Sequence, residues 1–164
     1  MEVSEELFRS AWRKFPTGVA VVTTSDEDGG LHGMTAVSVL SISTEPPMVL
    51  VSVGRERRTF ANLERLGRFG LNILSDAQTD WAEHFALPPL ERGSGPPGEY
   101  RVAASGVGIL EGSLAFLDCN VVAKHDAGDH VLFIGTVESA EGRDGSPLVH
   151  LEGEYLSLNQ DAPA

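Results

Sequence analysis

The chain has 164 residues, which fits one domain of ordinary size and excludes two large ones. Its 24 acidic residues outnumber its 12 lysines and arginines, so the formal net charge is -12 and the overall field repels nucleic acid and anionic membranes. Hydrophobic residues make up 41% of the sequence, but no apolar run approaches the roughly 20 residues that cross a bilayer. We expect a single globular domain over residues 1–164 that binds neither nucleic acid nor membrane.

The cysteine content and the first residues indicate a cytoplasmic protein. Cys119 has no second cysteine in the chain with which to form a disulfide, and residues 1–6 are acidic without an apolar signal segment. Cys119 lies on the apolar face of an alternating strand, with nothing nearby to activate its thiol. We therefore expect Cys119 to be a core residue without chemistry.

Three short helices are predicted from the spacing of apolar residues. The first spans residues 4–14, with Ser4 as a suitable N-cap. The others span residues 58–66, with Gly67 where a C-cap glycine is expected, and residues 78–85.

Alternating and β-branched runs between turn residues predict the strands. They are expected at residues 18–24, 34–43, 48–53, 69–74, 106–110, 114–124, 131–139 and 148–158, the last with a break at Gly153. Residues 34–43 are expected to be the return limb of a hairpin, and residues 48–53 a strand buried on both faces. Residues 87–105 are rich in Pro and Gly without periodicity, which predicts a mobile surface loop. About seven strands with a few outer helices predict a mainly β protein, an antiparallel barrel.

Several common site types are missing from the sequence. The five histidines are scattered, and no pair has the spacing of a zinc site, so no metal is expected. There is no Gly-x-Ser-x-Gly elbow, no phosphate loop with Gly-Lys-Ser/Thr and no Rossmann fingerprint. A dinucleotide would therefore have to bind on another scaffold.

A basic cluster precedes the second predicted helix. Arg55, Arg57 and Arg58 fall within four residues, and Thr59 lies at the start of the helix. Guanidinium groups, a hydroxyl and the N–H groups of a helix N-terminus all favour a phosphate. The alternative is a solvated basic loop that balances nearby glutamates.

Two further segments are candidates for ligand contact. Residues 33–38 concentrate small and hydroxyl residues in one strand, which allows a planar polar ligand to approach the backbone, although Thr and Ser are also common in strands. Gly128, Asp129 and His130 lie at the turn between two long strands, where Gly and Asp also suit a hairpin for backbone reasons.

Taken together, the sequence resembles the short-chain flavin reductase family, whose fold is the FMN-binding split barrel. The resemblance covers nearly the whole chain, and the order and spacing of its motifs carry it. The motifs are Phe15-Pro16-Thr17-Gly18-Val19, Gly33-Met34-Thr35-Ala36-Val37-Ser38, Ser41-Ile42-Ser43 with Pro46-Pro47, Val53-Gly54-Arg55 with Thr59, Asn72-Ile73-Leu74, Phe85-Ala86, Asp118-Cys119, Gly128-Asp129-His130 with Gly135 and Val137, and Pro147-Leu148 with Gly153 and Tyr155.

The resemblance implies an antiparallel split β-barrel with a few short flanking helices. It also implies an NAD(P)H-dependent reductase of free FMN or FAD that works as a homodimer and supplies reduced flavin to a separate monooxygenase component. The implied flavin-ring contacts are Thr35, Ala36, Val37 and Ser38; the implied phosphate contacts are Ser52, Val53, Arg55, Arg58 and Thr59; and Gly128, Asp129 and His130 are implied to seat the nicotinamide, with His130 as the catalytic residue.

The sequence departs from the family in one region. Many members carry a Lys-Phe or Arg-Phe element shortly after the Phe-Ala pair, whereas this chain continues with residues 87–90, Leu-Pro-Pro-Leu, and a Gly/Pro-rich loop. A 2′-phosphate would need one more basic contact, and Arg92, Arg101 and Lys124 are too dispersed for the sequence to identify it. The sequence therefore leaves both NADH and NADPH open, and the scarcity of positive charge favours NADH.

Three other functions are compatible with parts of this pattern. The first is a flavin-binding redox sensor or electron carrier without efficient turnover. The second is an oxidoreductase on the same fold with flavin as a fixed prosthetic group, because fold alone does not decide function. The third is an apolar-ligand barrel or interaction protein without flavin, which would make the cluster at residues 55–59 incidental.

Overall fold

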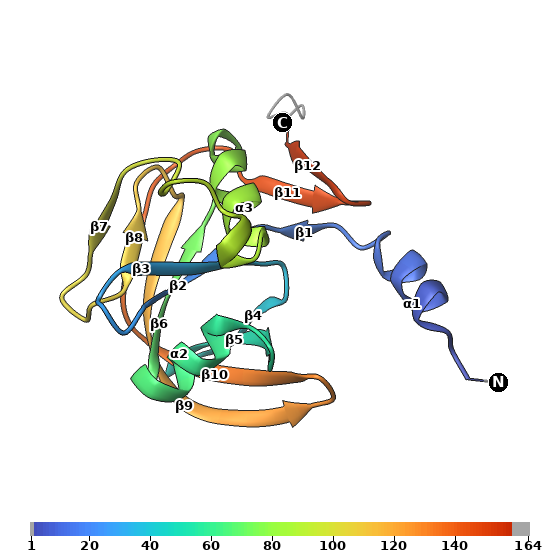
Figure 1. Cartoon of the computed structure of the whole chain (residues 1–164), viewed down its shortest axis with the longest axis horizontal. Helices are drawn as coiled ribbons and strands as arrows, with labels where there is room; N and C mark the ends of the chain where they lie inside the picture. The colour runs from blue at the N-terminus through green and yellow to red at the C-terminus, as the bar shows by residue number, and fades with distance from the viewer. Residues whose placement is uncertain (1, 159–164) are drawn as a thin grey trace.

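The structure is a computed structural model that describes residues 2–158. Its main element is a seven-stranded antiparallel sheet in the order β3-β2-β6-β9-β10-β5-β4 (Figure 1). The sheet does not close, because β3 and β4 follow each other in the chain yet lie at its two edges. The strands are β2 (Ala20–Ser25), β3 (Leu31–Ala36), β4 (Val39–Thr44), β5 (Pro47–Gly54), β6 (Arg68–Ile73), β9 (Ala115–Ala127) and β10 (His130–Gly142). The mainly β, antiparallel split barrel is confirmed.

Two smaller sheets complete the β-structure. One has the order β1-β11-β12, and the other pairs β7 with β8. Their strands are β1 (Thr17–Gly18), β7 (Tyr100–Val102), β8 (Gly108–Leu110), β11 (Leu148–Leu151) and β12 (Glu154–Ser157). The predicted break at Gly153 is confirmed as the turn between β11 and β12, where Glu152 and Gly153 have positive φ.

The three predicted helices are present, each within two residues of its expected bounds. They are α1 (Glu5–Trp12), α2 (Arg58–Leu66) and α3 (Thr79–Ala86), the last preceded by a 3-10 turn at Asp76–Gln78. The Ser4 side chain accepts from the Leu7 N–H at the start of α1, and Gly67 ends α2 in the left-handed conformation. No helix in residues 2–158 is both long enough and apolar enough to cross a membrane.

Strand β2 separates two hydrophobic clusters. Val22 belongs to the cluster that contains Phe69, Phe133 and, from α2, Leu63. The neighbouring Val21 faces the other way, into the cluster that α3 covers with Trp81 and Phe85. Because alternate side chains of β2 are buried on opposite faces, α2 and α3 lie on opposite sides of this end of the sheet.

Asn72 is the polar residue that ties the sheets together. It is fully buried, and its amide nitrogen lies 3.1 Å from the Thr23 hydroxyl and 3.2 Å from the Gly108 carbonyl oxygen. Its oxygen accepts from the Leu110 N–H at 2.8 Å. These bonds fasten β6 to both β2 and β8, so a polar side chain is tolerated in the core.

Two expectations about the strands were wrong. The return limb at residues 34–43 is not one strand: β3 ends at Ala36, and β4 begins at Val39 on the opposite edge of the sheet. The alternation of apolar residues continues from β3 into β4, so the sequence pattern does not show that the chain passes to the other edge of the sheet there. Strand β5 is not buried on both faces either, because Val49, Val51 and Val53 are buried whereas the residues between them are half-buried.

The loop at residues 87–105 contains a 3-10 turn at Pro89–Glu91 and strand β7.

A buried histidine connects β3 to α2 and makes the fold sensitive to pH. His32 is 3% exposed, and its Nε2 lies 3.0 Å from the Thr59 hydroxyl. Its Nδ1 lies 3.9 Å from a carboxylate oxygen of Asp26. Burial lowers the pKa of His32 to about 4, although Asp26 acts against this change. His32 is therefore neutral in the folded protein at pH 7, whereas its unfolded form takes up a proton near pH 6.5.

We expect this difference to reduce the free energy of unfolding as the pH falls from 8 to 5. The unfolded state binds the extra proton in that range, so stability is lost as the pH drops, by about 2 kcal/mol at pH 5. Urea unfolding across this range measures the loss. In His32→Gln, which keeps a hydrogen-bonding group toward Thr59, this part of the pH dependence should be absent. An equal slope in both proteins would contradict the assignment.

Candidate functional site

The open edge of β3 has backbone groups that no strand of the described chain, residues 2–158, pairs. Arg92 donates from Nη2 to the Gly33 carbonyl oxygen at 3.0 Å, so this carbonyl points away from β2. In an antiparallel ladder the backbone groups of alternate residues point to the same side. The N–H and C=O of Thr35 therefore also point out of the open edge. A ligand lying along β3 would find a hydrogen-bond donor and an acceptor there.

An apolar cavity lies at the end of this edge, where β3 gives way to β4. Its volume is about 380 Å³, and its walls come from the segment before β2 and from both sides of the Val37–Ser38 link. The lining residues include Phe15, Thr17, Val37, Val39 and Leu40. Within residues 2–158 the Thr17 hydroxyl is buried without a hydrogen-bond partner. A flat apolar group with polar edges fits these walls.

A second cavity of about 320 Å³ lies at the start of β3, between the beginning of α2 and the end of α3. It is polar and cationic, and its lining includes Asp26, His32, Arg58, His84 and Arg92. Arg58 is the first residue of α2, and its Nε lies 2.9 Å from the Asp26 carboxylate. His32 lines this cavity at one end of β3, and Val37, which directly follows the other end of β3, lines the apolar cavity, so the length of the strand separates the two cavities.

The predicted ring-binding segment reaches the edge mostly through its backbone. The Thr35 hydroxyl donates to the Ala82 carbonyl oxygen at 2.6 Å. This bond holds α3 against β3 and uses the hydroxyl hydrogen, so the hydroxyl cannot donate to a ligand at the same time. Ala36 is buried, and Val37 lines the apolar cavity. Ser38 and Ser52 are joined twice, since the Ser52 N–H donates to the Ser38 carbonyl and the Ser38 hydroxyl lies 3.3 Å from the Ser52 carbonyl oxygen.

The predicted phosphate cluster divides into two groups. Arg55 lies 2.5 Å from Asp126 on the β9–β10 hairpin, whereas Arg58 pairs with Asp26 on the β2–β3 turn. The structure therefore does not bring these two guanidinium groups together. Thr59 is buried with its hydroxyl held by His32, and Val53 is buried in the core. Of the predicted set, Arg58 is the side chain that faces the cationic cavity.

The turn at residues 128–130 lies beside Arg55. Gly128 has a φ of 63°, and the Arg55 N–H donates to the Asp129 carbonyl at 3.1 Å. The Asp129 carboxylate lies 2.8 Å from Nδ1 of His130, and this hydrogen bond lowers the pKa of Asp129. Neither the apolar nor the cationic cavity includes this turn. Its backbone is joined to the start of the loop that leads into α2, through Gly54 and Arg55.

Arg92 is the site residue that sequence reasoning set aside. It comes from the Pro/Gly-rich loop, seven positions after Phe85, and its guanidinium carbon lies 5.0 Å from the centre of the Phe85 ring. It also donates to the Leu87 carbonyl. No sequence pattern indicated it, because its contact with Gly33 joins residues 59 positions apart in the chain.

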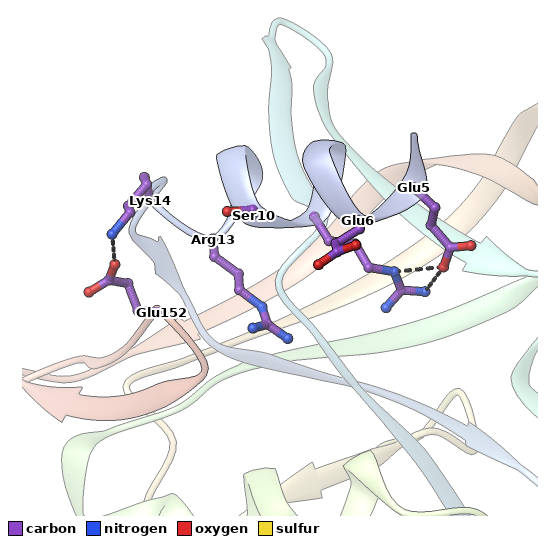
Figure 2. Close-up of a pocket in the computed structure, with 7 residues that line it drawn as sticks. Glu5, Glu6, Ser10, Arg13, Lys14 and Glu152 are labelled. Atoms are coloured by element: carbon purple, nitrogen blue, oxygen red, sulfur yellow. Dashed lines mark hydrogen bonds and ion pairs between the residues drawn. The ribbon is translucent and has the colours of Figure 1, made fainter. Parts of the chain in front are cut away.

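A wider hollow beside α1 does not have these properties. It measures about 680 Å³ and is lined by charged residues of α1 together with Glu152 (Figure 2). Arg9 pairs with Glu5, and Lys14 pairs with Glu152, while no aromatic side chain lines the hollow. This surface attaches α1 to the β11–β12 turn and offers nothing to hold a planar ligand.

Comparisons with known proteins identify the family of this chain. Residues 12–159 match the family described as "Flavin reductase like domain". The chain is 39% identical over 160 residues to an "NADH-dependent flavin reductase" of Rhodococcus sp, with 96% of this chain and 88% of the relative covered. It is 32% identical over 163 residues to the "Flavin-dependent monooxygenase, reductase subunit HsaB" of Mycobacterium tuberculosis, with 98% and 86% covered.

A solved structure extends the comparison to three dimensions. The NADH:FAD oxidoreductase SgcE6 of Streptomyces globisporus, in complex with NAD and FAD fragments, matches with a TM-score of 0.88 at 28% sequence identity. The match covers 99% of this chain and 100% of that one. On the strength of a family match that spans residues 12–159, the chain belongs to the flavin reductase like domain family.

Proposed function

We propose that this protein transfers hydride from NADH to FMN or FAD and supplies the reduced flavin to a separate monooxygenase component. Support comes from the relatives, which are named as an NADH-dependent flavin reductase and as the reductase subunit of a flavin-dependent monooxygenase. The observation that carries the proposal is the open edge of β3, with an apolar cavity at one end and a cationic cavity at the other.

The residues along this edge fit a flavin nucleotide. A flavin has a planar ring with polar edges and an anionic tail, and the two cavities differ in the same way. Val37, Leu40 and Phe15 would pack against the ring and exclude water, while the outward N–H of Thr35 would hold its polar edge. Arg58 and the first N–H groups of α2 would hold the phosphate.

The protein's contribution to the reaction is positioning. A bound flavin supplies the redox chemistry, because it accepts the hydride of NADH at its ring. The chain's own residues must hold the two rings in contact and stabilise the negative charge that reduction brings to the flavin. An N–H donor fixed by strand geometry does this without reorganising, and Thr35 is such a donor because β2 fixes its backbone.

The proposed function is tested by oxidation of NADH at 340 nm under anaerobic conditions. We expect the rate to be negligible without flavin and to rise with added FMN or FAD until the acceptor saturates. This outcome identifies flavin as a substrate. A protein that stays yellow on dialysis and oxidises NADH without added flavin would instead contain a fixed prosthetic group. Tight flavin binding without turnover would identify a carrier or sensor.

His130 is proposed to seat the nicotinamide. It is half-buried beside Arg55 and close in sequence to Asp129, whose carboxylate orients its ring. His130→Ala should raise the KM for NADH by about tenfold, since a hydrogen bond to a ligand contributes about 1 to 1.5 kcal/mol. Flavin binding, followed by fluorescence quenching, should change less than twofold. An unchanged KM for NADH would remove His130 from the site, and His125→Ala on the same hairpin is the control.

We further propose a homodimer, because α1 carries an apolar face that nothing else in residues 2–158 covers. No residue of α1 is buried, and Phe8 and Trp12 are 59% and 58% exposed. In Figure 1 the helix stands apart from the sheets. Phe8, Trp12 and Phe15 nevertheless form a continuous aromatic stack, with ring centres 6.3 Å and 5.2 Å apart. A second copy of the chain is the partner that this face and the nearby Leu40 fit.

Trp12→Glu should convert the dimer to a monomer. The charge would fall in the centre of the apolar face, and the monomer fold should survive because α1 buries nothing of its own. Light scattering after size exclusion measures the mass, and circular dichroism checks the fold. Ser10→Glu, on the opposite face of α1, should leave the mass unchanged. A Trp12→Glu protein that keeps the wild-type mass would contradict this interface.

A cytoplasmic location is also part of the proposal. The chain's one cysteine is buried as a free thiol, and burial raises its pKa to about 12, so nothing here depends on an oxidising compartment.

A further inference from the structure

The loop between α3 and β7 turns toward the protein at one residue. Every residue from Ala86 to Val102 is exposed except Arg92, which is half-buried. Its guanidinium donates from Nη2 to the Gly33 carbonyl oxygen on the open edge of β3, at 3.0 Å. Arg92 is therefore the point at which this loop is fastened to the large sheet.

Two further contacts hold Arg92 in this position. Its Nε donates to the Leu87 carbonyl oxygen at 3.0 Å, which closes a turn within the loop. Its guanidinium carbon lies 5.0 Å from the centre of the Phe85 ring, and Phe85 is only 3% exposed. A guanidinium over an aromatic face is attracted by the ring and shields it from water. Release of Arg92 would therefore break two hydrogen bonds and uncover part of an apolar ring.

The same position is costly for a cation. Among residues 2–158 no carboxylate oxygen lies within 4 Å of the Arg92 guanidinium, and burial lowers the pKa of Arg92. By contrast Arg68, which is also partly buried, is paired with both Asp118 and Glu138. Because desolvation without a counter-ion opposes the contacts of Arg92, its fastened and released positions differ less in free energy than those of a paired arginine.

The chain is stiff before Arg92 and flexible after it. Residues 88–91 contain two prolines and a 3-10 turn. Three glycines follow Arg92, at positions 93, 95 and 98, and Gly95 has a φ of 142°, which residues with side chains rarely adopt. Farther on, the Glu99 carbonyl accepts from the Glu111 N–H at 3.1 Å. Residues 93–98 therefore form a flexible connection between Arg92 and the attachment at Glu99.

This loop forms one wall of the cationic cavity. Its residues in the lining lie opposite residues from the start of β3 and the start of α2. The two groups are Gly93, Gly95 and Pro96 from the loop, and Asp26, His32 and Arg58 from the rest of the protein. Release of Arg92 would therefore move this wall away from the cavity and free the outward carbonyl of Gly33 at the same time.

We propose that residues 87–99 form a strap across the open edge of β3, fastened by Arg92, and that release of Arg92 opens the cationic cavity when a flavin enters or leaves. Arg92 is then a positioning residue, because it acts by holding the strap and needs no contact with the flavin. The gating rests on the proposed function, whereas the fastening does not. When a ligand exchanges through the released state, weaker fastening raises its association and dissociation rate constants together and changes its dissociation constant little.

Two substitutions separate the fastening from the positive charge. Arg92→Gln removes the charge and the long side chain. Arg92→Lys keeps the charge, but a single ammonium group cannot reproduce the fixed fork of donors that reaches the Gly33 and Leu87 carbonyls. Arg143→Gln removes an exposed positive charge outside this cavity and is the matched control. Circular dichroism checks that each variant is folded.

Movement of the strap is measured with a nitroxide label on Ser94→Cys in each background. Ser94 is exposed, and Cys119, the chain's own cysteine, is fully buried, so the label attaches at position 94. We expect the electron paramagnetic resonance spectrum to show a larger mobile fraction in Arg92→Gln and Arg92→Lys than in wild type or Arg143→Gln. Unchanged mobility in both Arg92 variants would overturn the fastening, whatever the result with flavin.

Flavin exchange is followed by quenching of FMN fluorescence in a stopped-flow instrument. We expect both rate constants to rise by about threefold to tenfold in both Arg92 variants, because one charged hydrogen bond shifts an equilibrium by about tenfold. The dissociation constant should stay within about twofold of wild type. A higher dissociation constant with an unchanged association rate, or wild-type rates in Arg92→Lys, would overturn the gating. Wild-type protein that binds no FMN would contradict both the proposed function and the gating, whereas the label alone still decides the fastening.

Discussion

The structure depends on a sheet that stops one pairing short of closure. β3 and β4 are consecutive strands joined by two residues, yet each forms an outer edge of the seven-stranded sheet. An unpaired edge normally invites aggregation, and proteins cover or charge such edges. Here Arg92 donates to one outward carbonyl of β3, that of Gly33, whereas the outward N–H and C=O of Thr35 have no strand partner within residues 2–158. A closed barrel with the same strands would satisfy these backbone groups internally and would have no open edge.

The second constraint is the way in which β3 is held rigid while its edge stays open. Each face of the strand is fixed by a different helix: His32 is bonded to Thr59 of α2, and the Thr35 hydroxyl is bonded to the Ala82 carbonyl of α3. Gly33 is required between them, because a Cβ there would come within 2.9 Å of the Phe85 ring. Side-chain hydrogen bonds therefore perform the function that a neighbouring strand would perform in a closed sheet. The side chains of His32 and Thr35 therefore support the strand, and its outward backbone groups stay free of strand pairing within residues 2–158.

The features that sequence reasoning predicted well are the ones set by local chemistry. The Ser4 cap, the Gly67 C-cap and the turn at Gly153 follow from backbone preferences within a few residues, and α2 begins and ends where its periodicity does. The change of edge between β3 and β4 could not be predicted in this way, because it is a long-range choice of partner that leaves the alternation intact. The same limit explains Arg55 and Arg58, which are three positions apart in sequence but pair with Asp126 and Asp26 on different hairpins. The position of Arg92 was not predicted for the same reason, because a loop 59 positions away in the chain brings it to Gly33.

The charge distribution shows why so acidic a chain can still recruit anionic ligands. A net charge of -12 repels NADH and flavin phosphates at long range, but within about 8 to 10 Å at physiological salt only nearby charges matter. Most arginines are neutralised by nearby carboxylates, as Arg101 is by Glu111 and Glu141, so the net charge around them is small. Where the pairing is incomplete, at the start of β3, a local positive field survives in a partly buried, low-dielectric setting that strengthens it. The excess of acid elsewhere therefore does not cancel the positive charge of this cavity, because carboxylates farther away are screened by salt.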